Sequence, residues 1–313
     1  MRSQDTLSYI KQVKGRAMGH PSLSKIEIDR LSDAWTGLKE RPLATELVPV
    51  RIVTILEVFV RDWVEQIIDQ GFPYVERAAT LKLDLKFDWT LTSNVRLGTV
   101  TLGQLVAHNI STSRLETIKS ALDTLISDDL FARISLVVNR WEVEVMGSPP
   151  IPIIADNDKL RRDLFRLFEV RHILVHELPK GPIVSSDDVE SFLQSAKLFV
   201  EATDEFLSEL LWGKYPLTQR DMNATAAERN KSALEDLAKV CSEIESEYEE
   251  WGSDLWTVQK QWNQFREADA EWQSREAEGG SMQSMLYSMA SEAHAKARTK
   301  ELRDWLNRGR QNR

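Results

Sequence analysis

The 313-residue sequence has a single cysteine, Cys241, and no long apolar run. One cysteine cannot form an intramolecular disulfide, so a disulfide-stabilised fold is excluded and a reducing compartment is favoured. A membrane-spanning helix needs about 18 consecutive apolar residues, and no segment provides them. The N-terminal residues MRSQDTLSYIKQVKG also lack the apolar stretch of a secretory signal. We therefore expect a cytoplasmic protein that makes no contact with a membrane.

The sequence also has fewer basic than acidic residues. Lys and Arg total 40 against 49 Asp and Glu, which gives a formal charge of -9. Because phosphate contacts require cations, this balance argues against a surface that binds nucleic acid everywhere, although a local basic cleft stays open. The hydrophobic content of 42% is typical of globular proteins, and the length suffices for one large or two ordinary domains.

Strand-like alternation is sparse, whereas helical periodicity recurs along the chain. Apolar residues between positions 50 and 69 repeat with a period of 3.6, and the sequence GFP at 71–73 ends that segment. Further helices are indicated at about 158–177, up to Leu178-Pro179, and after Ser186. The sequence therefore predicts an all-α fold.

The composition changes near residue 220. Residues 228–278 are highly charged and contain no proline, EGGSMQ at 278–283 interrupts the pattern, and the last segment is basic. Two antiparallel helices of complementary charge are the simplest arrangement of these segments. We expect a helical-bundle domain at 1–220 and a smaller helical-hairpin domain at 221–313.

The segment FEVRHILVHELP at 168–179 places polar residues in an apolar helix. His172 and His176 share a helix face, while Arg171 and His176 are separated by about 140° around the axis. These residues can be ordinary polar core, a metal site of H-x-x-x-H spacing, or a site of metal-independent RNA cleavage. In the last case histidine transfers protons and arginine binds phosphate. The zinc-hydrolase pattern requires Glu where Ile173 stands, so we expect no metal and no cofactor.

The segment Arg171–His176 resembles the R-x(4–6)-H motif of the HEPN superfamily, in particular its RiboL-PSP-like ribonucleases. The resemblance extends over roughly residues 45–215. The helix at 50–69, which contains Glu57 and Asp62, is similar to an early helix of that family, and VTLGQLVAHNISTSRLETIKSALDTLISDDLFARI is similar to the region before its catalytic helix. The resemblance implies a HEPN-type helical bundle, endoribonuclease activity, and a role as a toxin or in phage defence.

The resemblance also implies roles for individual residues. Arg171 would bind the scissile phosphate and His176 would act as general acid or base. Supporting roles fall to His172 and Glu169, and RNA binding to Arg161, Arg162 and Arg166. Such proteins commonly form homodimers with a composite active site, and an antitoxin or defence partner is expected. Some members have lost catalysis, so a regulator that binds RNA, a nucleotide or a protein is the alternative.

The C-terminal segment resembles a second family. WTVQKQWNQFREADAEWQSREAEGGSMQSMLYSMASEAHAKARTKELRDW is similar to LprI-type lysozyme inhibitors over about residues 230–306. Members of that family carry a pair of cysteines, and Ala270 and Ala290 occupy the corresponding positions here. We expect a helical accessory domain without a disulfide. Its tryptophans are predicted to form the helical core, and these are Trp251, Trp256, Trp262 and Trp272.

Overall fold

The computed structural model describes residues 3–14, 20–83, 88–177 and 179–311. It divides into two compact units, Met1–Lys214 and Tyr215–Arg313. The all-α prediction is confirmed, because the described residues form helices and no named strand, with one isolated bridge between Val138 and Pro152. None of the described helices is long and apolar enough to cross a membrane.

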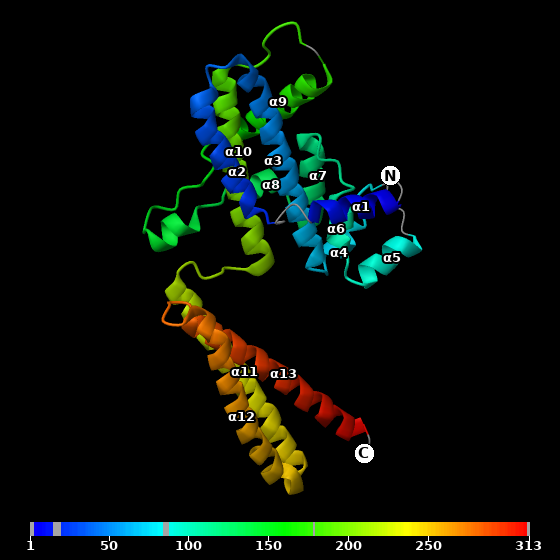
Figure 1. The fold of residues 1–313 in the computed structure, drawn as a ribbon, viewed down its shortest axis with the longest axis vertical. Coiled ribbons are helices and arrows are strands. Elements are labelled where there is room, and N and C mark those ends of the chain that lie inside the picture. Colours follow the sequence, from blue (N-terminus) through cyan, green and yellow to red (C-terminus); the bar gives the residue numbers. More distant parts are fainter. Residues whose placement is uncertain (1–2, 15–19, 84–87, 178, 312–313) are drawn as a thin grey trace. The chain divides into compact units, whose positions relative to one another are not determined.

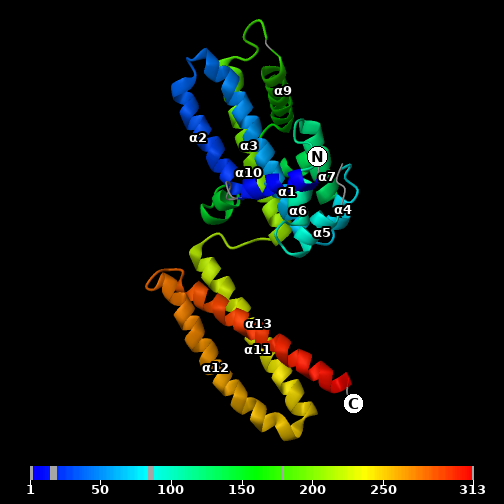
Figure 2. The same ribbon diagram turned by 45° about the vertical axis from the view of Figure 1, so that its right-hand side comes forward.

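The first unit contains helices of very different length (Figure 1). In chain order they are α1 (Ser3–Lys14), α2 (Ser22–Leu38), α3 (Pro42–Asp69), α4 (Tyr74–Ala78), α5 (Trp89–Arg96), α6 (Leu102–Ala107), α7 (Leu115–Ile126), α8 (Leu130–Ile134), the π-helix η1 (Trp141–Val145), α9 (Asn157–His176) and α10 (Ser186–Trp212). The helices α2, α3 and α10 pack against one another, and α9 packs against both α3 and α10 (Figure 2).

Helix α3 forms the centre of this bundle. It starts at Pro42, where the fixed φ of proline suits the first turn of a helix, and it continues through Pro49. Its inward side chains are fully buried at Ile52, Phe59 and Trp63, and they belong to one core cluster with residues of α2, α7, α8, α9 and α10. The helix predicted at 50–69 is therefore correct but begins about two turns earlier, at Pro42.

The second unit consists of α11 (Gln219–Glu247), α12 (Gly252–Ser274) and α13 (Gln283–Gln311), with 3-10 turns η2 (Glu249–Trp251) and η3 (Arg275–Ala277). Helix α13 packs along both α11 and α12. The predicted hairpin is thus a three-helix unit. At the turn after Glu247 the rings of Tyr248, Trp251 and Trp305 cluster, with centroids 5.1–5.6 Å apart.

The contact between α12 and α13 is built from small and polar residues. Ala270 and Ala290, the positions that correspond to cysteines in the LprI-type pattern, are both buried. The prediction that tryptophans form this core is wrong for Trp272, whose side chain is 66% exposed, and also for Trp251 and Trp256. Alanines let the helix backbones approach closely, and that close approach leaves no space for indole rings. An apolar core does form between α11 and α13, around the buried Cys241.

Candidate functional site

Helix α9 carries every residue that the sequence assigns to the site. It starts after Asp156, whose side chain accepts a hydrogen bond from the backbone N–H of Lys159 at 2.8 Å. It ends at His176, because Glu177 already has an extended backbone. Apolar residues bury one side of the helix, namely Leu160, Leu164, Leu167, Phe168 and Val170. The opposite side therefore presents its polar residues to solvent.

The two histidines of α9 lie side by side on that open face. Their ring centroids are 4.9 Å apart with an interplanar angle of 53°, and both side chains are exposed. The four-residue spacing of His172 and His176 produces this contact directly. Within the described part of the chain, no group of three or more metal-ligating side chains gathers. Both imidazole rings are therefore accessible to a ligand from the solvent side.

Arg171 lies on a different side of α9, toward α3. Its Nη2 is 3.9 Å from Oε1 of Glu57, and the two side chains are 22% and 14% exposed. Oε2 of the same carboxylate is 3.8 Å from Nη2 of Arg61, which donates a hydrogen bond to Oγ1 of Thr112 at 2.9 Å. A five-residue separation rotates Arg171 by about 140° from His176. Within one chain, the two predicted catalytic residues therefore occupy different faces.

A groove runs between α9 and the start of α7. It consists of two adjoining depressions of about 410 Å³ each, which share Glu116 and Phe165 as lining residues. One holds Arg161 and Arg162, and the other extends to His172. The remaining lining residues are Ser113, Arg114, Leu115, Lys119, Phe131, Asp158, Arg166, Phe168, Glu169 and Ile173. Five of the seven predicted site residues thus line the groove, whereas Arg171 and His176 do not.

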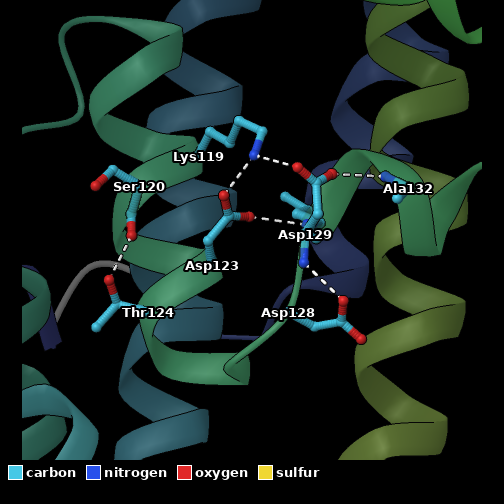
Figure 3. Close-up of polar contacts among 8 residues, drawn as sticks. Lys119, Ser120, Asp123, Thr124, Asp128, Asp129 and Ala132 are labelled. Carbon is cyan, nitrogen blue, oxygen red and sulfur yellow. Dashed lines mark hydrogen bonds and ion pairs between the residues drawn. The ribbon is translucent and has the colours of Figure 1, made fainter.

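The cations of this groove differ in how strongly the protein already holds them. Figure 3 shows the Lys119 ammonium between the carboxylates of Asp123 and Asp129, with the second contact at 2.6 Å. The hydrogen bond from Lys119 holds the pKa of Asp129 below its ordinary value, and backbone N–H donation from Ala132 acts in the same direction. Lys119 therefore fastens α7 to the start of α8 and is not available to a ligand.

Two of the predicted RNA-binding arginines are also engaged. The guanidinium of Arg161 lies over the ring of Phe131, 5.5 Å from its centroid. Arg166 forms an ion pair with Glu169 at 3.9 Å and donates a hydrogen bond to the carbonyl oxygen of Ile183 at 3.3 Å. Arg162, in contrast, makes no ion pair or side-chain hydrogen bond with any described residue.

Sequence reasoning missed Arg114 and Phe165. Arg114 precedes α7, is exposed, and like Arg162 has no ion-pair partner among the residues that the structure describes. Phe165 is 46% exposed although it stands on the central helix of the site. Helical spacing could have identified Phe165, because position 165 falls on the same helical face as positions 161, 169, 172 and 176. Arg114 could not be identified from the sequence, because it joins the groove only through the packing of α7 against α9.

The segment of α3 near Glu57 also contains Asp62, whose pKa is shifted. Partial burial, and to a lesser degree the nearby charge of Glu65, raise the pKa of Asp62 to about 6. His108, which packs edge-on against Tyr9, has its pKa lowered by burial, and its Nδ1 lies 3.0 Å from the carbonyl oxygen of Gln104. These contacts indicate a structural role for His108.

Comparison with known proteins identifies one part of the chain. Residues 214–302 match the family model described as Lysozyme inhibitor LprI, so the second unit carries an LprI-like domain. The match begins at Lys214, the last residue of the first unit, and covers no other residue of that unit. No curated protein and no solved structure matches the chain.

Proposed function

We propose that the protein is a metal-independent endoribonuclease of HEPN type that acts as a toxin or phage-defence effector in the cytoplasm, with an antitoxin or defence-system protein as its partner. The observation that carries the proposal is the composition of one helix. The open face of α9 holds His172 and His176 side by side, and the groove along it contains Arg162 and Arg114, neither of which forms an ion pair with a residue that the structure describes. Proton-transfer groups and phosphate-binding groups are therefore adjacent, as RNA cleavage requires.

The reaction needs one base, one acid and a cation. The base removes the proton from a ribose 2′-OH, whose oxygen forms a bond to the adjacent phosphorus. The bond from phosphorus to the 5′-oxygen breaks as the acid protonates that oxygen, and a 2′,3′-cyclic phosphate results. His176 is the acid or base, His172 orients it or contacts RNA, and Arg171 stabilises the charge on the phosphate. Glu169, close to Arg166, lies at the same part of the groove.

A homodimer completes this site. Arg171 points toward Glu57 and is rotated by about 140° from His176, so one chain does not present both groups to one phosphate. A two-fold symmetric contact near the end of α9 would bring Arg171 of one chain toward His176 of the other. Each composite site then has its arginine and its histidine from different chains.

The test is RNA cleavage by the full chain in excess EDTA. We expect wild-type protein to cleave RNA and to leave cyclic phosphate ends, and His176→Ala to abolish cleavage while the helical circular dichroism and melting temperature stay unchanged. His20→Ala, which removes another exposed histidine, is the matched control and should retain activity. Cleavage by purified His176→Ala at the wild-type rate would refute the assignment.

A non-catalytic RNA-binding regulator is the second candidate. It is favoured by the half-buried position of Arg171 against Glu57, which suits a structural ion pair. In this case wild type and Arg171→Ala are equally harmless when expressed in bacteria, and neither cleaves RNA, while binding persists. Toxicity that disappears with Arg171→Ala favours the nuclease.

The LprI-like domain in the second unit is proposed to serve as an accessory module. Lysozyme inhibition is the activity that the family name describes. The buried alanines at 270 and 290 are a departure from the cysteine pair of that family, and they support reuse of the helical fold within a reducing compartment.

A further inference from the structure

The face of α9 that leads to the two histidines is a continuous stripe. Positions 161, 165, 169, 172 and 176 recur at intervals of three and four residues, so they lie along one side of the helix. The groove against α7 follows this stripe from Asp158 to Ile173. In its middle, Phe165 is shared by both depressions and is 46% exposed. An aromatic ring is therefore accessible at the centre of a polar groove.

The cations flank this ring on both sides. Arg162 stands one turn before Phe165 on α9, and Arg114 reaches the same groove from α7. Neither guanidinium forms an ion pair with any residue in the described ranges, so each is available for a phosphate at no cost of broken protein contacts. Exposed arginines around an exposed ring form the combination that binds single strands, because bases stack on the ring while phosphates meet the cations.

We infer that the α7–α9 groove is a binding track for single-stranded RNA, in which Phe165 stacks on a base and Arg114 and Arg162 hold the flanking phosphates. This inference rests on the proposed function and adds to it a strand selectivity and two binding residues outside the motif. A double helix keeps its bases stacked inside and cannot offer a base face to Phe165. The track runs toward His172, so a strand held there is delivered to the histidine pair.

Acidic residues in the groove set a limit on its affinity. Glu116 borders both depressions, and Glu169 lies close to Arg166. Their carboxylates repel phosphate, so moderate affinity with strong salt dependence is expected. Replacement of Glu116 by glutamine should therefore strengthen RNA binding, which a purely structural role of the groove does not predict.

The test measures binding separately from cleavage. The full chain carries His176→Ala so that the probe stays intact, and a fluorescein-labelled oligouridine of about 12 nucleotides, long enough for one groove, reports binding by anisotropy. Phe165→Leu keeps an apolar side chain but removes the ring, and should raise the Kd about tenfold. Phe165→Tyr keeps the ring and should bind like the parent. Trp89→Leu, which removes an exposed aromatic side chain on α5, is the matched control.

The roles of Arg162 and Arg114 are tested by the salt dependence of RNA binding. Arg162→Gln or Arg114→Gln should each lower the slope of log K against log salt concentration by about 0.7, the value for one phosphate contact on a single strand. Arg41→Gln removes an exposed arginine outside the groove and should leave the slope unchanged. A duplex RNA of the same length should bind more weakly and be indifferent to Phe165→Leu.

The outcomes separate this inference from the proposed function. Unchanged single-strand affinity in Phe165→Leu overturns the track, and if wild type still cleaves RNA the nuclease proposal stands alone. Phe165-dependent binding without any cleavage by wild type supports the track and removes the nuclease. If the His176→Ala chain binds neither single-stranded nor duplex RNA, the inferred RNA track is overturned. An acidic protein is then the remaining ligand that suits the arginines of the groove.

Discussion

Arg171 of α9 and Glu57 of α3 bring their charged groups to within 3.9 Å, and the same carboxylate lies 3.8 Å from Arg61. This ion pair joins two helices that are far apart in the sequence, and it contributes to the rotation of α9 about its axis. With Arg171 turned toward α3, His172 and His176 are directed to the open side. The pair therefore links the packing of the bundle to the orientation of the candidate site.

Glu57→Gln tests that link through stability. The substitution leaves two half-buried guanidinium groups beside each other without their shared anion, so we expect a loss of about 1 kcal/mol in the free energy of unfolding. A double-mutant cycle with Arg171→Ala should give a coupling energy of about 0.5 kcal/mol. Urea denaturation followed by circular dichroism measures both quantities. Strictly additive effects would show that the two residues do not interact.

Asp62→Asn should stabilise the protein at neutral pH. The folded-state pKa of Asp62 is raised to about 6 from 3.8, so the folded protein binds more protons than the unfolded chain between these values. The free energy of unfolding of the wild type therefore falls as pH rises from 4 to 6. The Asp62→Asn variant avoids that loss because asparagine does not ionise. We expect a gain of about 1 kcal/mol at pH 8, after allowance for partial solvent access, and no gain at pH 3.

Unfolding midpoints across that pH range measure this effect. Glu46→Gln removes an exposed carboxylate from the same helix and serves as the control for the loss of one negative charge. An Asp62→Asn stability curve parallel to that of wild type would mean that the carboxyl is not perturbed.

Ala270 and Ala290 offer a test of the LprI-like unit. Ring contact between Phe265 and His294 and a hydrogen bond from Arg266 to Ser291 set α12 antiparallel to α13. This register brings position 270 near position 290. The double variant Ala270→Cys with Ala290→Cys should form a disulfide on mild oxidation and stabilise the second unit by about 3 kcal/mol.

Gel mobility without reductant and unfolding with and without reductant measure that outcome. The native thiol does not compete, because Cys241 is buried and its burial raises its pKa, which disfavours the reactive thiolate. Ala270→Cys alone is the control and should remain reduced. Two free thiols in the oxidised double variant would contradict the register.

Features that depend on periodicity within one helix were predicted correctly from the sequence. Predictions were wrong or missing for contacts between segments that are distant in the sequence. The apolar period of α3 and the end of α9 near Pro179 were legible because each reflects residues within one helix. The burial of the tryptophans in α12 was wrong, because the spacing between α12 and α13 is set by small residues such as Ala290 on the partner helix. Arg114 was missed for a similar reason, since its position beside α9 depends on how α7 packs.

The faces of α9 show the same division. Helical geometry alone predicted that His172 and His176 are neighbours, and their rings lie 4.9 Å apart. The direction in which Arg171 points relative to the core depended on Glu57, a residue that periodicity does not select as a partner. Residue types and spacing therefore located the candidate site, while packing determined which of its members face the same ligand.

The separation of Arg171 and His176 makes subunit mixing the sharpest test of a composite site. Arg171→Ala and His176→Ala should each be inactive alone. In a heterodimer of the two, one site combines the intact arginine of one chain with the intact histidine of the other, and the second site lacks both. Random exchange puts half of the chains into heterodimers, so the mixture should recover about a quarter of wild-type RNA cleavage.

The control is a mixture of either variant with the double variant, which contains no complete site in any pairing and should remain inactive. Exchange is achieved by mild denaturation and refolding of the mixed chains, and cleavage is measured in EDTA. If wild type cleaves RNA after the same treatment but the mixture of single variants does not, Arg171 and His176 act within one chain. The half-buried Arg171 would then have to leave Glu57 during catalysis, and Glu57→Gln would raise activity rather than reduce it.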